Sequence, residues 1–438
     1  MTRISGSGAA GVRLSSSPLA GLATATVALV KAHATVNPTQ NLVNASLFIV
    51  STHSSPDNNL VTSPMQSHIF CVTEARLCDI VKEQMTVEKG KRFVLVTADV
   101  EAVLTRLRGE ALSPRQDFVE LARALDAEIL SFSDVPRGSV LTRWLAKYAG
   151  KAAALAWLAF WRKGSFYFVT AENTAIPLAL LLKFRRGVTL AMIGHRVTTP
   201  QKSRILRVFR LFNQIGMMLC YSRQQERFAQ ERLGVPARQI RRIAFQVDEN
   251  FFTPGASAEP GCGVVSVGRE LRDYPTLFEA LDGTDIPVTV VASSPWSKRE
   301  DQTSGRKVPA NVTLRKGLSS VELRDLYRSA AVVVVPLMNV DWPAGVTSLF
   351  EAQACGRPVV ISASEGILDS IDPGAAVTVP CGDARALRDA VQRLIRDPVA
   401  AAGIARVGRE SALRERTLDQ FVARIREACR VAEERGGA

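Results

Sequence analysis

The alternation of short β-branched runs with amphipathic segments constrains this chain most. From Arg92, "RFVLVT" has the composition of a buried strand, "PRQDFVELARALDA" carries apolar residues at helical spacing, and "EILSF" is strand-like again. The segments "SFYFVTA", "PLALLLKF" and "VTLAMIGH" repeat the same order. Such alternation predicts a parallel sheet covered by helices on both faces.

The pattern runs twice. Between residues 245 and 263, "FQVDENFFTPGASAEPGCG" shifts to Pro, Gly and Ser, and the alternation then restarts with "GVVSVG", "YPTLFEAL" and "PVTVVAS". A length of 438 residues suits two domains. We therefore expect an α/β fold of two doubly wound, Rossmann-like domains, at 85–250 and 263–438, with a linker at 251–262 and helices at the C-terminus. In such folds ligands bind at the carboxyl ends of the strands, here in the cleft between the domains.

The first 84 residues read differently. An apolar run at Leu19–Val30, followed by Ala32-His33-Ala34, resembles a secretory signal, but residues 38–84 are rich in Ser, Thr and Asn without periodicity. We favour an extension that is disordered or that precedes a true start at Met85. The literal G-x-G-x-x-G at Gly6–Gly11 lies between no strand and no helix, so we reject it as a dinucleotide site. Seven scattered Cys without a C-x-x-C pair are typical of reduced thiols in the cytoplasm.

Positive charge is concentrated in one segment. The whole chain has a net charge of +13, whereas Ser139–Gln246 holds 19 Lys and Arg against three acids, a net +16. This indicates an anionic partner. "WLAKYAGKAAALAWLAFWRKG" and "QKSRILRVFRLFNQIG" mix cations with apolar residues and suit a helix lying on an anionic membrane; core helices with solvated arginines are an equal alternative. No nucleic-acid motif or strand platform of stacking aromatics is present, so we expect no nucleic-acid partner.

Two segments of the second half carry candidate ligand groups. In "SVGRELRDYPTLFEAL", Gly268 follows a strand and lets a ligand approach the backbone, and Arg269 suits two-pronged phosphate binding. Arg272 lies one helical turn further on. The alternative is a turn glycine with solvated arginines.

The stretch "WPAGVTSLFEAQACGRPVVI" is the second. Gly345, Val346 and Thr347 would present backbone N–H groups at a helix N-terminus, which attracts phosphate. Glu351, one turn inside, could accept hydrogen bonds from ribose hydroxyls. Ser348-x-x-Glu351 equally matches a capping box, in which both side chains only close the helix end.

These segments, with "SVELRDLYRSAAVVVVPL" and the linker "FQVDENFFTP", resemble the GT-B glycosyltransferases of family 4 in order and spacing. The resemblance covers most of the last 190 residues. It implies that the second domain binds a nucleoside-diphosphate sugar, with Arg269 on the diphosphate, Glu351 on the ribose, and Gly345, Val346 and Thr347 at the phosphate end. It also implies retention at the anomeric carbon.

His195 ends the strand "VTLAMIG", where the family frequently has a histidine near the acceptor or the transferred sugar. We expect His195 to be functional, although a structural histidine is the alternative, and Arg196 to be an acceptor-side cation. The chain departs from the family at Pro343, where a second acid is common, with Asp341 nearby but out of register. The family's Lys after Gly-Arg is also missing, and Arg272 is the candidate to replace its charge.

The expected function is sugar transfer from a nucleoside-diphosphate sugar to a glycan, lipid-linked or small-molecule acceptor. No D-x-D pair occurs, so we expect a metal-independent reaction without a cofactor. The expected location is cytoplasmic, with peripheral contact at the inner face of the plasma membrane. The alternative function is a non-catalytic GT-B-like nucleotide-sugar-binding protein or partner subunit.

Overall fold

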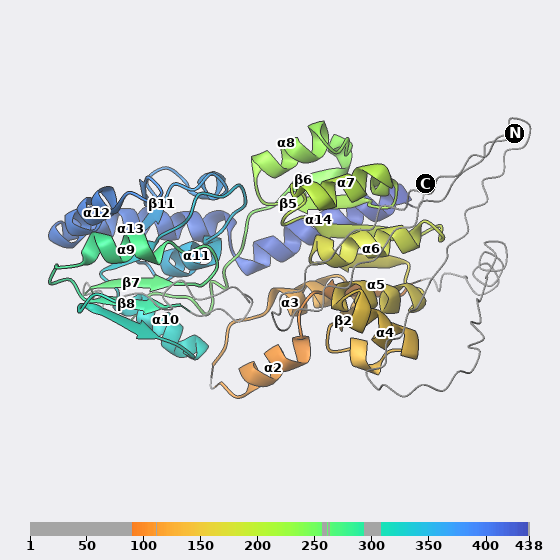
Figure 1. The fold of residues 1–438 in the computed structure, drawn as a ribbon, viewed down its shortest axis with the longest axis horizontal. Helices are drawn as coiled ribbons and strands as arrows, with labels where there is room; N and C mark the ends of the chain where they lie inside the picture. Colours follow the sequence, from red (N-terminus) through yellow and green to blue (C-terminus); the bar gives the residue numbers. More distant parts are fainter. Residues whose placement is uncertain (1–89, 111, 256–260, 262, 293–307, 437–438) are drawn as a thin grey trace, which may run out of the picture. The chain divides into compact units, whose positions relative to one another are not determined.

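The computed structural model describes residues 90–110, 112–255, 261, 263–292 and 308–436. The expectations for residues 1–84 lie outside these ranges, as does most of the Gly- and Pro-rich part of the expected linker. The described chain forms two six-stranded, fully parallel sheets flanked by helices (Figure 1). The expected α/β fold with two doubly wound domains is confirmed.

The first domain is built on residues 92–242. Its strands are β1 (Arg92–Val96), β2 (Glu128–Ser131), β3 (Phe166–Val169), β4 (Thr189–Ile193), β5 (Met217–Cys220) and β6 (Ile240–Arg242). Its helices are α2 (Val100–Arg108), α3 (Asp117–Ala124), α4 (Val140–Tyr148), α5 (Lys151–Trp161), α6 (Glu172–Leu182), α7 (Pro200–Val208) and α8 (Arg223–Glu231), with short 3-10 turns η1 (Val135–Arg137), η2 (Leu211–Asn213) and η3 (Ala237–Gln239). The strand order is β2-β1-β3-β4-β5-β6.

The second domain begins at residue 263. Its strands are β7 (Val264–Val267), β8 (Val288–Val291), β9 (Val312–Arg315), β10 (Val332–Val335), β11 (Val359–Ser362) and β12 (Val377–Val379). Its helices are α9 (Tyr274–Leu281), α10 (Ser320–Ser329), α11 (Val346–Ala354), α12 (Ala384–Arg396) and α13 (Pro398–Glu415), with the turn η4 (Leu368–Ser370); α14 (Leu418–Gly436) ends the chain. The strand order is β12-β11-β10-β7-β8-β9.

The order of the second sheet marks a ligand crevice. The first strand in the chain, β7, lies in the middle, and the connections go to one side through β8 and β9 and to the other through β10, β11 and β12. Helices from the two directions diverge between β7 and β10, and ligands of doubly wound sheets bind outside the carboxyl ends of strands at such a switch point. The loops that follow these two strands contain Gly268, Arg269 and Gly345.

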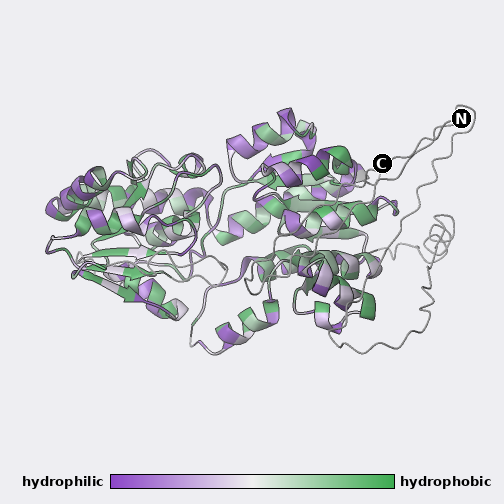
Figure 2. Ribbon diagram, viewed as in Figure 1, coloured by the Kyte–Doolittle hydropathy of each residue, from purple (hydrophilic) through white to green (hydrophobic). Residues whose placement is uncertain are grey.

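Each face of the first sheet has its own apolar core. On one face, small residues of α5, among them Ala154 and Ala159, are fully buried against α6 and the sheet. Figure 2 shows hydrophobic residues along both of these helices. On the other face, α3 packs against residues such as Val94 and Phe168. No helix within the described ranges is both long and apolar enough to cross a bilayer.

The last helix differs from the expectation that the C-terminal helices all belong to 263–438. Apolar residues of α14 at helical spacing, Phe421, Ile425 and Cys429, are buried in the core shared with Val94 of the first sheet. The ribbon of α14 runs among the elements of the first domain (Figure 1). The chain therefore returns to the first domain after α13. At this return, the Leu418 N–H donates to the carbonyl of Val247 over 2.9 Å.

The start of the expected linker is packed rather than loose. Phe251 and Phe252 are buried in the core of the second domain. Just before them, the carboxylate of Asp248 accepts hydrogen bonds from the backbone N–H and the Nε of Arg115, at 2.7 and 2.9 Å. The passage out of the first domain is thus held at its start by buried groups.

Candidate functional site

Two loops at the switch point of the second sheet are joined to each other by backbone hydrogen bonds. Arg272, in the loop after β7, forms an antiparallel bridge with Leu337, in the loop after β10. The backbone N–H of Met338 donates to Leu271 over 3.1 Å, and that of Asp273 donates to Pro336 over 3.0 Å. The two loops that carry the candidate residues are therefore joined at this point.

Arg272 is buried behind this junction rather than free to meet a ligand. Its Nε donates to the carbonyl of Val267 at 3.0 Å, its Nη1 to that of Glu270 at 3.1 Å, and its Nη2 to Oγ of Ser348 at 2.8 Å. The Ser348 hydroxyl in turn donates to the Val267 carbonyl at 3.0 Å. Arg272 and Ser348 thus fix the end of β7 against α11, and burial lowers the pKa of Arg272.

Gly268 is required by this packing. Its φ of +120° is a conformation that side chains disfavour, and an added Cβ would overlap the guanidinium of Arg272. The carbonyl of Gly268 accepts a short hydrogen bond from the Tyr274 hydroxyl. The backbone therefore turns sharply at Gly268 and leads directly into Arg269.

Arg269 differs from its neighbour in having a donor to spare. It is half-buried, and its Nε is buried with no hydrogen-bond partner among the described residues. A buried guanidinium nitrogen without a partner is unfavourable unless a ligand satisfies it. Nε of Arg92, Arg185, Arg196 and Arg357 also lacks a partner among the described residues, so the expectation that Arg269 binds an anion rests on this donor together with its place in the loop after β7.

The helix α11 begins without a side-chain cap. Its N-cap is Gly345, in the left-handed region at φ +85°, and no side-chain cap bond forms among the described residues. The first intrahelical bond of this end runs from Leu349 N–H to the Gly345 carbonyl at 3.0 Å. The preceding N–H groups, at Val346, Thr347 and Ser348, are the free donors of a helix N-terminus, which favour phosphate.

The capping-box interpretation of Ser348 and Glu351 is wrong. Since α11 starts at Val346, Ser348 lies in the third helical position rather than at the cap, and its hydroxyl bonds Arg272 and Val267. Capping boxes do occur in this chain, at Ser222 with Gln225 and at Ser319 with Glu322. Glu351 is left without a role in closing its own helix.

Glu351 instead lies against the neighbouring helix. Its Oε2 accepts a hydrogen bond of 2.9 Å from the hydroxyl of Tyr327 on α10. Burial raises the pKa of Glu351 to about 7, although the bond from Tyr327 and the charge of Arg272 both act to lower that pKa. A carboxylate that changes charge near neutral pH, one turn from a free helix end, suits a ligand-binding role.

In the first domain, His195 follows β4 and is held on three sides. Its backbone N–H donates to Oε2 of Glu172 at 3.0 Å, its carbonyl accepts from Nε2 of Gln225 at 2.7 Å, and its Nε2 lies 2.9 Å from the carbonyl of Thr170. A carbonyl only accepts, so Nε2 carries the proton, and Nδ1 of the neutral ring is left as an acceptor.

Glu172 anchors this arrangement from the start of α6. It is buried, and its second oxygen pairs with Nζ of Lys202 at 2.6 Å. The imidazole of His195 also lies beside the ring of Tyr221, with centroids 5.3 Å apart. Burial raises the pKa of nearby Asp117, while hydrogen bonds from Phe118 N–H and Gln246 act to lower it.

Arg196, the expected acceptor-side cation, stacks on an aromatic ring of the second half of the chain. Its guanidinium carbon lies 4.2 Å from the centroid of Trp342, and its buried Nε has no partner in the described ranges. Trp342 directly precedes Pro343 and the loop to Gly345, and Asp341 before it is half-buried. Arg196 therefore reaches the segment that leads to the start of α11.

Sequence reasoning missed the residues that position the candidates. Tyr327 and Glu172 carry no local signal, because each acts across a distance in sequence, on Glu351 and His195 respectively. Only the expected topology could have indicated them, since both lie on helices flanking the strand ends. In the described ranges, no three His, Cys, Asp or Glu side chains gather as metal ligands would.

Residues 271–397 match the family model described as "Glycosyl transferases group 1". Over 111 residues the chain is 37% identical to a D-inositol 3-phosphate glycosyltransferase of Saccharomonospora viridis. That match spans 24% of this chain and 25% of the length of the curated relative.

Solved structures share the fold over most of the described chain. A glycosyltransferase from Rickettsia africae matches with a TM-score of 0.59 at 14% identity, covering 79% of this chain and 99% of the other. A sucrose-phosphate synthase from Thermosynechococcus elongatus gives 0.60 at 17% identity, covering 78% and 98%. HepE from Anabaena, in complex with UDP-glucose, gives 0.58 at 16%, covering 77% and 98%.

The family match includes α11 and Glu351, and Gly268 and Arg269 lie just before its first residue. Residues 271–397 are thus similar to the group 1 glycosyltransferases, and they lie within a chain that has the two-domain GT-B fold.

Proposed function

We propose that this protein transfers a sugar from a nucleoside-diphosphate donor, bound by the second domain, to an acceptor bound by the first. The observation that carries the proposal is the pairing of Arg269, with its unsatisfied Nε, and the uncapped start of α11 on two loops joined at the switch point. Together they offer a cation and free N–H groups to one diphosphate. The neighbour HepE, which binds UDP-glucose, supports this class of donor.

Each donor-side residue has a distinct part in this proposal. Arg269 and the N–H groups of Val346 and Thr347 hold the diphosphate, and Gly268 and Gly345 let the phosphates approach the backbone. Glu351 accepts hydrogen bonds from the vicinal ribose hydroxyls, which requires its ionised form. Arg272 and Ser348 act as positioning residues, because their donors are committed to the backbone and to each other.

The proposed reaction exchanges one bond of the anomeric carbon for another. The bond to the diphosphate oxygen breaks, a hydroxyl oxygen of the acceptor bonds to the carbon, and the hydroxyl proton leaves with the diphosphate. Arg269 and the start of α11 stabilise the charge that develops on the leaving group, so the proposal needs no metal ion and no cofactor. Retention at the anomeric carbon is part of the proposal.

On the acceptor side, Nδ1 of His195 has no hydrogen-bond partner among the described residues. Because Thr170 fixes the opposite nitrogen and Glu172 fixes the backbone, the ring is preorganised to accept a hydrogen bond from a sugar hydroxyl. Arg196 adds a cation beside it. The acceptor is a glycan, a lipid-linked sugar or a small molecule.

A non-catalytic nucleotide-sugar-binding protein or partner subunit is a second candidate, favoured by Pro343 at the place of a second acid. Both candidates bind the donor, but only the transferase consumes it. Release of nucleoside diphosphate from a sugar nucleotide by the purified protein, above the rate without protein, supports the transferase; binding without turnover supports the second candidate.

The donor site is tested by a thermal-shift screen of the full chain with UDP, GDP, ADP and dTDP. We expect one or more of them to raise Tm, and Glu351→Ala to weaken that response while keeping a cooperative unfolding transition. Asp325→Ala, which removes an exposed carboxylate of α10, is the matched control and should respond as the wild type does. An unchanged response of Glu351→Ala would contradict the proposed site.

A further inference from the structure

The amino-terminal edge of the first sheet carries a concentration of cations that the proposed reaction does not use. Parallel strands begin at the same edge, and β3, β4, β5 and β6 are consecutive neighbours. The segments that precede them therefore lie side by side. We name residues 161–165, 183–188, 207–216 and 232–239 the basic edge.

The composition of the basic edge is one-sided. It contains nine Lys and Arg and no Asp or Glu: Arg162, Lys163, Lys183, Arg185, Arg186, Arg207, Arg210, Arg232 and Arg238. Within the described ranges, none of them forms an ion pair. Arg185 is buried and structural, since its guanidinium donates to the carbonyls of Phe160 and Gly164 at 3.0 and 3.2 Å and so ties the ends of α5 and α6 together. Of the other eight cations, Lys163 is half-buried and the remaining seven are exposed.

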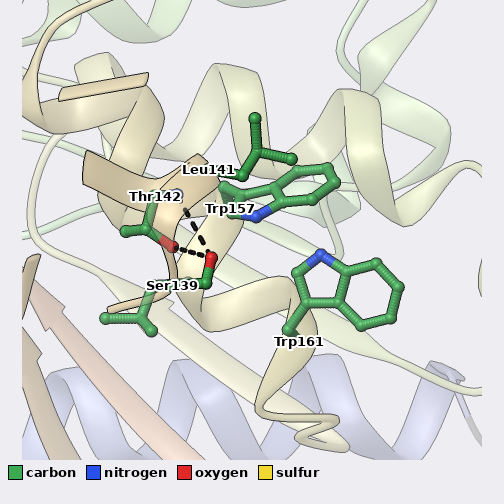
Figure 3. A pocket seen from close by; sticks show the side chains of 6 residues that line it. Ser139, Leu141, Thr142, Trp157 and Trp161 are labelled. Atoms are coloured by element: carbon green, nitrogen blue, oxygen red, sulfur yellow. Dashed lines mark hydrogen bonds between the residues drawn. The ribbon is translucent and has the colours of Figure 1, made fainter. Parts of the chain in front are cut away.

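Large apolar side chains stand exposed among these cations. Phe184 is 67% exposed, Val208 66%, Phe209 45% and Trp161 38%. Trp161 also lines an apolar hollow of about 290 Å³ with Trp157 and Leu141 (Figure 3). Aliphatic and aromatic side chains interspersed with Lys and Arg are the composition of a surface that enters the headgroup layer of a membrane.

A second hollow, of about 340 Å³, lies at the other end of the same edge. Arg207, Arg210 and Arg238 line it, with Asn213 and Gln239 between them. Arg435 adds a further cation here, because its guanidinium donates to the carbonyl of Arg238. This end has the charge and the donors to receive the phosphate of a lipid headgroup.

We propose that the basic edge docks on the surface of an anionic phospholipid bilayer, with Phe184 and Trp161 entering the headgroup layer. The cations supply attraction to negative lipids, and the apolar side chains supply insertion. His195 and Glu172 follow the carboxyl ends of β4 and β3, at the opposite edge of the same sheet, so docking leaves the candidate acceptor side uncovered. The exposed apolar residues favour a bilayer over a nucleic acid, which would be bound through its phosphates and stacked bases.

The test is co-sedimentation of the full chain with vesicles of phosphatidylcholine plus phosphatidylglycerol, and with vesicles of phosphatidylcholine alone. We expect binding to the anionic vesicles only. Raising the salt from about 0.1 M to about 1 M should release the protein, because the Debye length falls from about 10 Å to about 3 Å. No sedimentation with anionic vesicles at low salt would overturn the proposal.

Two variants locate the surface. Arg207→Gln with Arg210→Gln and Arg238→Gln should lower the vesicle partition constant roughly 100-fold, since each cation near an anionic surface contributes about fivefold. The matched control is Arg385→Gln with Arg393→Gln and Arg396→Gln, three exposed cations of α12, which should partition as the wild type does. An equal loss in both triple variants would contradict docking at the basic edge.

For the apolar part, Phe184→Ser is compared with Val399→Ser, where the valine is 84% exposed on α13. Only Phe184→Ser should weaken binding, and melting curves of both variants should match the wild type. Equal partitioning of the two variants would contradict insertion, as would binding of a DNA or RNA duplex in place of vesicles. Because vesicle binding is measured without nucleotide, its failure would leave the proposed transferase function untouched, and the reverse also holds.

Discussion

The hydroxyl of Tyr327 donates a hydrogen bond of 2.9 Å to Oε2 of Glu351 and so joins α10 to α11. This bond helps to hold the carboxyl in its charged form, against the burial that raises its pKa to about 7. A ligand whose hydroxyl groups donate hydrogen bonds to Glu351 would lower this pKa and favour the ionised carboxylate. The loss of one hydrogen-bond partner would raise the pKa.

Tyr327→Phe tests this relationship. Removing the hydroxyl takes away the largest of the influences that lower the pKa of Glu351, so that pKa should rise above about 7. Nucleotide binding needs the ionised carboxylate, and its affinity should therefore increase with pH along a curve displaced to higher pH in the variant. Calorimetric titrations with UDP between about pH 6 and about pH 9 measure both curves. Superimposable curves would show that Tyr327 does not tune Glu351.

The pH dependence of stability gives an independent check on Glu351. Its folded-state pKa of about 7 lies above the ordinary value of 4.5, so the folded protein holds the proton more tightly. The free energy of unfolding should thus fall as pH rises from about 4.5 to about 7, by up to about 3 kcal/mol from this group.

In Glu351→Gln this loss is absent, so the stability of the variant relative to the wild type should increase with pH over the same window. Urea unfolding at several pH values, without nucleotide, measures the difference. Parallel profiles for the two proteins would mean that Glu351 ionises in the folded state as it does in the unfolded chain.

Ser348→Ala tests the hydrogen bonds of Arg272 and Ser348, which hold the end of β7, just before Arg269, against α11. The substitution leaves Nη2 of Arg272 without its buried acceptor and removes one of the two hydrogen bonds to the carbonyl of Val267, which should cost about 1 to 3 kcal/mol of unfolding free energy. The neighbouring Thr347 is exposed, so Thr347→Ala should change the stability by less than about 0.5 kcal/mol. The midpoints of urea unfolding compare the two. Similar small changes in both would remove Ser348 from the positioning network.

Glu172→Gln tests the frame around His195. An amide can accept only through its one oxygen, so it cannot serve both the His195 N–H and Lys202 as the carboxylate does. The rate of nucleoside diphosphate release in turnover should fall roughly 10- to 100-fold, because His195 would be displaced from its position on the proposed acceptor side. The affinity for the donor should stay unchanged. Glu231→Gln, at an exposed acid of the same domain, is the control. A weaker donor affinity without a slower turnover would place Glu172 outside the acceptor side.

The fold was largely predictable from the sequence because strands buried on both faces are continuous apolar runs. "AVVVVPL" and "RPVVIS" could only be interior strands, and β10 and β11 pair in parallel there. The exception is α14, whose apolar residues at helical spacing predict a helix but not the sheet it covers. Phe421 and Ile425 pack on the first sheet, which no local pattern distinguishes from the second.

For the site, the sequence indicated the positions that we assign to ligand contact more readily than those that support them. Gly268, Arg269 and Gly345 follow strands, and topology then brings them together. Arg272 shows the limit of such reasoning, since a charged residue near a strand end reads as a ligand group, yet the structure buries it against Val267. Whether an arginine points outward or inward depends on acceptors supplied by another loop.

In the proposed complex, Arg269 holds the diphosphate of the nucleotide and Glu351 holds its ribose. Calorimetric titration of the wild type, Arg269→Gln and Glu351→Gln with both UDP and uridine at about pH 8 tests this division. Arg269→Gln should weaken UDP binding roughly 10- to 100-fold, the effect of losing a hydrogen bond to a charged group, and should leave uridine binding unchanged. Glu351→Gln should weaken both ligands by a similar factor. Equal losses of UDP and uridine in Arg269→Gln, or unchanged uridine binding in Glu351→Gln, would contradict the account.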